Sequence, residues 1–191
     1  MTQSTLGENL SKVLGLPLLR LDAISHQPYF QDTPPEIFRS QVVQFIESNQ
    51  NGWIIDGNYR NILGHITWGA ASDIVWLDYP IYVVLWRLWF RTIGRIRSSE
   101  KLWGLEGCVE TWQSQFLSKD SLLYVPWFST ATYLSLWVFY FYHKRRPVFH
   151  EELVAKKKGL LEGVNVIRFQ WPSETASWLD RIRRDEKSLD K

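Results

Sequence analysis

The stretch Ser4–Asp22, STLGENLSKVLGLPLLRLD, decides the fold, because it predicts a helix followed at once by a short buried strand. Thr5 is the predicted N-cap of the helix, and Glu8 lies three residues further on, as a capping box requires. The strand leads directly to Asp22. A hydroxyl-rich helix N-terminus beside a buried strand is a common place for a protein to hold phosphate. The apolar positions have helical spacing, and a glycine and a proline end the run: Leu6, Leu10, Val13, Leu14, Gly15 and Pro17.

A strand that ends in aspartate occurs twice more along the chain. Apolar residues 53–55 precede Asp56, and residues 74–77 precede Asp78. Helices are predicted between these strands and a last strand follows near the C-terminus, so we expect an α/β protein with a parallel sheet. Ligands of such sheets bind at the carboxyl ends of the strands, where Asp22, Asp56 and Asp78 would converge. The alternative is that each aspartate only forms a turn or caps a helix.

The composition of the chain excludes several classes of protein. Its 191 residues are enough for one domain over residues 1–191 with a full core. A net charge of +2 is too small to indicate nucleic-acid binding, and the single cysteine, Cys108, excludes an intramolecular disulfide framework. The four histidines do not have the spacing of a metal site. The first residues lack the pattern of a signal peptide, so we expect a cytoplasmic protein.

The helix predicted over residues 81–97 has two different faces. Arginines on one face can neutralise the charge that builds up on a transferring phosphoryl group once water is excluded. The alternative is a solvated face that pairs with nearby carboxylates. The arginines are four apart, as Arg87, Arg91 and Arg95, and the opposite face holds Trp86, Trp89, Phe90 and Ile93.

Residues 121–142 carry no formal charge and are followed by the basic run HKRR. We favour a helix packed within the domain, as part of an aromatic helical segment over residues 119–146. An interfacial or partner-binding helix and a true membrane span are the alternatives. Pro126 and the many hydroxyl-bearing residues argue against a span.

Several segments, taken together, resemble one known family. They are STLGENLSKVLGLPLLRLDA, GWIIDGNYR, IVWLDYP, LWGLEGCVETW and FLSKDSLL, and they fall within residues 4–123. In this order and spacing they resemble the adenylate-kinase-like P-loop NTPases, in particular the subgroup of DNA-topology-modulation proteins. The resemblance implies a three-layer parallel sheet with helices on both faces and a lid-like flap over residues 98–118. It also implies phosphoryl transfer from ATP, with Mg²⁺, to a nucleotide or small-molecule acceptor.

The resemblance implies roles for the first residues of the chain. Ser4 and Thr5 match the hydroxyl residues that close the phosphate-binding loop, Ser4 as a ligand of Mg²⁺ and Thr5 on a phosphate. Gln3 takes the position of the loop lysine and would also face ATP. Beside these matches, Arg91 and Arg95 are the candidate catalytic arginines.

Further residues acquire roles on the acceptor side. Asp22 falls where related small-molecule kinases place a carboxylate that orients or deprotonates the acceptor. Asp78 would mainly hold the turn after its strand, and an indirect role at Mg²⁺ is the alternative. The turn after the second strand resembles the D-G-x-x-R turn with which adenylate kinases hold the acceptor nucleotide, in the subgroup's own D-G-N-Y version: Asp56, Gly57, Asn58, Tyr59 and Arg60.

The sequence departs from the family at the phosphate-binding loop. The full loop is G-x-x-x-x-G-K-[ST], but Gln3 stands in place of the lysine, Thr2 in place of the last glycine, and the earlier positions are absent. In the flap, Val109 stands where the family usually has arginine. Two cations that should meet the transferring phosphate are therefore missing, and we expect phosphoryl transfer to be impaired.

The strand before this loop is central in the family's sheet, between the strands that end in Asp56 and Asp78. Without it, the two inner edges must close on each other, be filled otherwise, or leave a weakened domain. We favour a start error in the sequence. The alternatives are a degenerate, non-catalytic relative and a protein that still binds a nucleotide through the helix end and the arginines alone. The alternative function is a binding or scaffold protein that uses residues 121–142, or a protein attached to a membrane through them.

Overall fold

The computed structural model describes residues 3–98, 101–109, 146–147, 153, 161 and 163–189. The chain divides into two compact units, and we describe each by itself. The first comprises Met1–Gln27, Gln31–Tyr79 and Leu160–Lys191, and the second comprises Pro28–Phe30 and Pro80–Gly159. A single domain over the whole chain stays a prediction.

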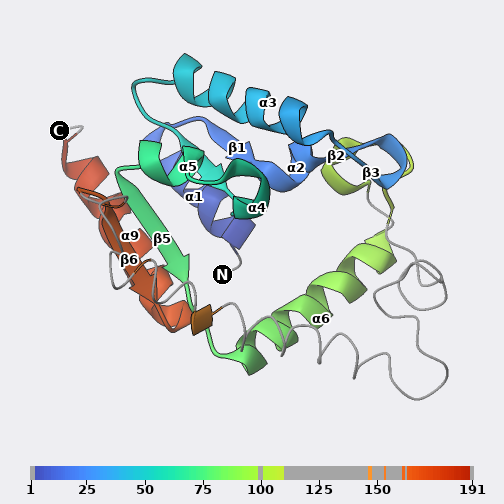
Figure 1. Cartoon of the computed structure of the whole chain (residues 1–191). Helices are drawn as coiled ribbons and strands as arrows, with labels where there is room; N and C mark the ends of the chain where they lie inside the picture. Colours follow the sequence, from blue (N-terminus) through green and yellow to red (C-terminus); the bar gives the residue numbers. More distant parts are fainter. Residues whose placement is uncertain are drawn as a thin grey trace. The chain divides into compact units, whose positions relative to one another are not determined.

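Short strands alternate with helices in the first unit (Figure 1). Its helices are α1 (Gln3–Leu14), α2 (Leu21–Ser25), α3 (Pro35–Ser48), α4 (Arg60–Leu63), α5 (Ile66–Ala70) and α9 (Pro172–Leu189). Its strands are β1 (Leu18–Arg20), β2 (His26–Gln27), β3 (Gln31–Asp32), β4 (Ile54–Asp56), β5 (Asp73–Leu77) and β6 (Asn165–Phe169).

The longer strands form two parallel pairs. β1 pairs with β4, with Leu18 opposite Ile54 and Arg20 opposite Asp56. β5 pairs with β6 over five residues, and β2 and β3 form a small antiparallel hairpin. The prediction of an α/β protein with parallel strands is therefore confirmed.

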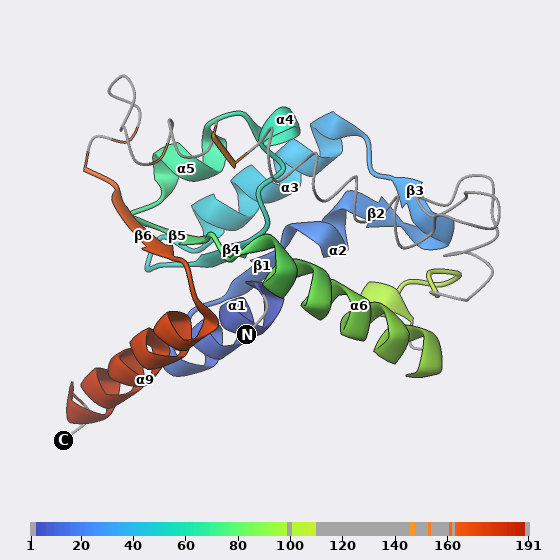
Figure 2. The same ribbon diagram turned by 90° about the horizontal axis from the view of Figure 1, so that it is seen from below.

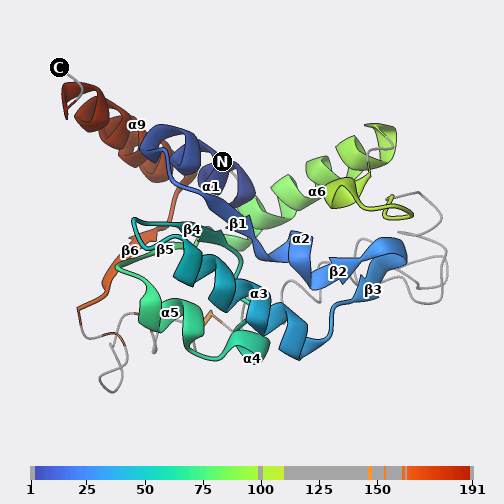
Figure 3. The same cartoon turned by 90° about the horizontal axis from the view of Figure 1, so that it is seen from above.

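Alternation along β1 and β4 sends side chains to two different cores, because successive residues of a strand point to opposite faces. On one face, Leu19 and Ile55 pack against the fully buried Phe38 and Val42 of α3, together with Leu21 and Leu63. On the other face, Ile54 packs against a core formed by Leu6 and Leu10 of α1 and Leu179 of α9. Figures 2 and 3 show α1 and α9 on one side of the strands and α3 on the other.

The α1 core also joins the two parallel pairs. Val75 and Leu77 of β5 pack against the same buried leucines as Ile54 of β4. Among the described strands, however, none pairs with the second edge of β4 or of β5. Of the three outcomes expected for these inner edges, closure on each other is therefore not observed within the described residues.

Several local predictions were wrong. α1 begins at Gln3, so Thr5 lies inside the helix rather than at its N-cap, and Glu8 is ion-paired with Arg20 of β1. Asp22 does not end a strand, because β1 stops at Arg20 and Asp22 lies in the first turn of α2. Asp22 is nevertheless close to β1 in the sequence, so its carboxylate lies at the carboxyl end of that strand.

In the second unit, a 3-10 turn (Pro28–Phe30) docks on the segment 101–109. Tyr29 N donates to Glu106 O at 2.9 Å, and Phe30 N donates to Cys108 Sγ at 3.3 Å. The Tyr29 ring lies so close to Gly107 that an added Cβ there would stand 2.3 Å from a ring carbon, so a larger residue would displace the ring.

The second unit also contains α6 (Ile81–Ser98) and a 3-10 turn (Leu102–Gly104). The predicted flap over residues 98–118 is described only at residue 98 and over residues 101–109, where Lys101 forms an isolated bridge with Val109. The predicted aromatic segment, and residues 121–142 within it, lie outside the described residues except for residue 146. Within the part of the chain that is described, no helix combines the length and the hydropathy that a bilayer crossing needs.

Candidate functional site

Three predicted residues meet at the carboxyl end of the β1–β4 pair. Ser4 lies in the first turn of α1, Asp22 in the first turn of α2, and Asp56 is the last residue of β4. Ser4 forms a side-chain hydrogen bond with Asp56, and the charge of Asp22 acts on Asp56. We call Ser4, Asp22 and Asp56 the Asp56 cluster.

Asp56 is unfavourable as an anion in this position. Burial raises the pKa of its carboxyl above the ordinary value of 3.8, and this is the largest effect. The hydrogen bond from Ser4 lowers the pKa of Asp56, and the Asp22 charge raises it. Two smaller effects follow: the Arg20 charge lowers the pKa and the Glu8 charge raises it. A buried carboxylate beside other carboxylates destabilises a fold unless a ligand or cation needs it, so function is the simplest reason for its presence.

The raised pKa of Asp56 predicts a specific pH dependence of stability. The folded state holds the Asp56 proton more tightly than the unfolded state does. The favourable contribution of this proton to the free energy of unfolding is therefore complete below pH 3.8, and it is lost as pH rises through the folded pKa of Asp56. Asp56→Asn avoids this loss, so it should be more stable than the wild type at neutral pH and lose the advantage below 3.8. Urea unfolding of both proteins across this pH range measures the difference. A variant that is less stable than the wild type at neutral pH would contradict the assignment.

The Asp56 cluster carries an excess of negative charge. Arg20, the β1 residue opposite Asp56, is ion-paired with Glu8, and both side chains are partly exposed. The charges of Asp22 and Glu8 both disfavour the Asp56 anion and that of Arg20 favours it, so a divalent cation would relieve the repulsion among the carboxylates. Among the described residues, no three His, Cys, Asp or Glu side chains form a group that could hold a metal ion. Mg²⁺ here would use the Ser4 hydroxyl, one or two carboxylates and the phosphates of a ligand, which is the usual way proteins bind it.

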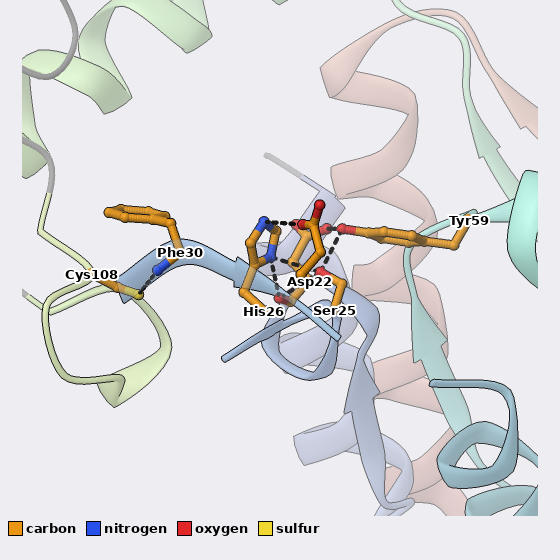
Figure 4. Close-up of polar contacts among 7 residues, drawn as sticks. Asp22, Ser25, His26, Phe30, Tyr59 and Cys108 are labelled. Carbon is orange, nitrogen blue, oxygen red and sulfur yellow. Dashed lines mark hydrogen bonds and ion pairs between the residues drawn. The ribbon is translucent and has the colours of Figure 1, made fainter. Parts of the chain in front are cut away.

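The turn that follows Asp56 has a strained backbone. Gly57 has a φ of 129°, and Tyr59 has a φ of 29°, which is unusual for a residue with a side chain. The Tyr59 hydroxyl donates to Asp22 Oδ1 at 2.9 Å, and its ring packs on Phe38 with centroids 5.1 Å apart. Figure 4 shows the phenol pointing at Asp22. Strain of this kind persists where the surroundings fix it, and it is concentrated at ligand-binding sites.

A hydrogen-bond network extends from Asp22 through Tyr59 to two residues that the sequence did not single out. Ser25 Oγ lies 2.8 Å from the Tyr59 hydroxyl and 2.8 Å from His26 Nδ1 (Figure 4). His26 Nε2 is 3.9 Å from Asp32 Oδ1. Burial, chiefly, raises the pKa of Tyr59 to about 12, so the phenol remains a neutral donor that orients Asp22.

Asn58 and Arg60, the other polar residues of the turn, have different surroundings. Asn58 Oδ1 is buried and accepts no hydrogen bond from the described residues. Such an atom calls for a reason, and a donor on a bound ligand supplies one. The Arg60 guanidinium lies 5.0 Å from the ring centroid of Trp68 on α5, which is a cation–π contact. Its convergence on the Asp56 cluster stays a prediction.

The remaining predicted residues lie as follows. Gln3 and Thr5 are exposed in the first turns of α1. Arg91 and Arg95 lie on α6, which belongs to the second unit. Their predicted action on a phosphoryl group bound at the Asp56 cluster therefore stays a prediction. Asp78 is buried in an ion pair with Arg168 of β6, which agrees with a role in holding the turn after β5.

No family model, curated protein or solved structure matches this chain.

Proposed function

We propose that the chain binds a magnesium nucleotide such as MgATP at the Asp56 cluster, as a relative of the P-loop nucleotide and small-molecule kinases in which phosphoryl transfer is impaired. The proposal includes the family's three-layer sheet with helices on both faces and a cytosolic setting. The observation that supports it best is the meeting of a helix-start hydroxyl, Ser4, with two carboxylates, Asp22 and Asp56, at the carboxyl end of parallel strands.

Each element of the cluster has a chemical task in this proposal. The amino end of α1 presents backbone N–H groups and a partial positive charge to the phosphates. Ser4 and Asp56 would hold Mg²⁺, and the cation would offset the repulsion between the buried Asp56 carboxylate and the exposed Asp22 carboxylate. Asp22, oriented by the Tyr59 phenol, faces the acceptor and accepts its hydroxyl proton.

The turn from Asp56 to Arg60 is the proposed acceptor site. The buried Asn58 Oδ1 is an unused acceptor, which suits an amino or hydroxyl group of the ligand. Arg60, stacked on Trp68, presents a fixed guanidinium that suits an anionic acceptor.

Impaired transfer follows from Gln3. Glutamine can donate a hydrogen bond but carries no charge toward the β- and γ-phosphates, where the family's lysine acts. A protein that binds the nucleotide without transferring phosphate fits this substitution, so the alternative of a non-catalytic binding protein shares the same site. Residues 121–142, through which the binding or scaffold protein would contact its partner, lie outside the described residues.

Isothermal titration with MgATP tests the proposal. Gln3→Lys should tighten binding by about tenfold, because one charge-assisted contact to phosphate is gained. Asp56→Asn should weaken binding in the presence of Mg²⁺ and change it little in EDTA. Asp180→Asn removes an exposed carboxylate from α9 and is the control. Binding that is absent from the wild type and from Gln3→Lys, or that Asp56→Asn leaves unchanged, would refute the nucleotide site.

A further inference from the structure

The strand β4 of the first unit has one edge whose backbone groups no described strand uses. In a parallel ladder, alternate residues bond to one neighbour, and the residues between them face the other side. Ile54 N donates to Pro17 O at 2.9 Å, so Ile54 faces β1 and Ile55 faces away from it. The N–H and C=O groups of Ile55 therefore lie on the open edge of β4, and no described strand pairs with that edge.

The strand β5 has an open edge of the same kind. Asp78 N donates to Phe169 O of β6 at 2.8 Å, so the alternate residues of β5 that are in step with Asp78 face β6. Val75 and Leu77 lie between those residues and face the other side. Their backbone groups form no hydrogen bond with another described residue, and both residues are partly exposed.

The two open edges border the same position in the first unit. Ile54 of β4 packs against the buried leucines of α1 and α9, and so do Val75 and Leu77 of β5. Figures 2 and 3 show the strands in the order β6, β5, β4 and β1. Paired strands lie about 4.8 Å apart, and β4 and β5 are further apart than that. The position between them is therefore that of one further strand.

Hydrogen bonding and side-chain chemistry together select the occupant of this position. The unpaired groups of a strand edge are a template for another strand, and proteins bind extended peptides in this way. Successive side chains of a strand here would point alternately to the α3 core, on which Ile55 packs, and to the α1 core. Both sets must then be apolar, as in other parallel strands that are covered on two faces.

We infer that the first unit binds an extended apolar segment of a partner protein as a strand between β4 and β5. The segment pairs with the backbone of Ile55 on one side and with that of Val75 and Leu77 on the other. A lipid does not present the alternating donors and acceptors that two strand edges require. This inference does not depend on the nucleotide site.

Amide hydrogen exchange of the full chain tests the inference, with the synthetic peptide KKVIVIVKK as the probe. Without the peptide, the amides of Ile55, Val75 and Leu77 should exchange at least about tenfold faster than that of Ile54, which donates within the β1–β4 pair. The peptide should slow exchange at both edges together by at least about tenfold. The control peptide KKVKVKVKK is apolar on one side only and should bind at least about tenfold more weakly, because its lysines would enter a core.

Val75→Pro removes a donor from the open edge of β5 and none from its ladder with β6, so it should weaken binding of KKVIVIVKK by at least about tenfold. Val166→Pro is the matched control, because by the same alternation Val166 of β6 faces away from β5, and it should leave binding unchanged. If a proline variant fails to fold, the exchange of the wild type decides alone.

The inference is overturned if the amides of Ile55, Val75 and Leu77 are already protected without the peptide, or if the peptide protects neither edge or only one. It is also overturned if folded Val75→Pro binds the peptide as the wild type does. Protection of these amides that rises with protein concentration alone would overturn it too, because a second copy of the chain would then be the occupant.

Discussion

Arg168→Met is expected to destabilise the first unit by about 3–5 kcal/mol at neutral pH, because it leaves a buried carboxylate without its cation. Asp78 is only 4% exposed, and its Oδ2 accepts from Arg168 Nη2 at 2.5 Å and from Nε at 2.9 Å. The Arg168 guanidinium also lies 4.9 Å from the ring centroid of Trp76. Methionine keeps the apolar length of the side chain over this ring, so the lost charge dominates the result.

Urea unfolding measures this effect, and two further variants interpret it. Arg183→Met breaks an exposed pair with Asp180 on α9 and should change stability by less than about 1 kcal/mol. The double variant Asp78→Asn/Arg168→Met should recover part of the loss, since the buried negative charge is then removed together with the guanidinium. If Arg168→Met changed stability as little as Arg183→Met, the ion pair would not hold the ends of β5 and β6 as described.

The second large effect is expected for Gly57→Ala, which should destabilise the chain by about 3 kcal/mol or more through backbone strain and overpacking. The φ of 129° is one that residues with side chains rarely adopt. An added Cβ would also stand 2.8 Å from the Cβ of the fully buried Leu21, and neither backbone can easily give way. The shift needed would carry the Tyr59 hydroxyl away from Asp22.

Gly15→Ala is the matched control for this substitution. Gly15 has a φ of 65°, but no atom lies within 4 Å of the position of its Cβ, so only the conformational effect of about 1–2 kcal/mol remains. Thermal or urea unfolding compares the two variants directly. Equal losses would mean that contact with Leu21 does not fix the turn after β4.

The fold class and the core of the candidate site could be predicted from local pattern. Apolar runs of strand length that end near aspartates indicated the parallel strands and placed Asp22 and Asp56 at one edge. The pattern could not show where β1 stops, because LPLLRLDAIS is apolar on both sides of the boundary. The capping box failed for a related reason: Glu8 makes a tertiary ion pair with Arg20, and local propensity cannot anticipate it.

The rest of the site depends on contacts between distant parts of the chain. Ser25 and Tyr59 are 34 residues apart, and Asp78 and Arg168 are 90 residues apart, so no local pattern connects them. Ser25 and His26 belong to none of the motifs found in the sequence and offered no signal of their own. The periodicity of α6 did predict two faces, but only the structure shows that the aromatic face is exposed.

The most direct test of the central claim is a titration of ¹⁵N-labelled protein with MgADP, followed by the backbone amide resonances. The account predicts saturable shifts at Ser4, Asp22 and Gly57, which disappear in the Ser4→Ala/Asp56→Asn variant, while Asp73 at the opposite end of β5 stays unchanged. Saturable shifts confined to other parts of the chain, or shifts that survive in the double variant, would contradict it.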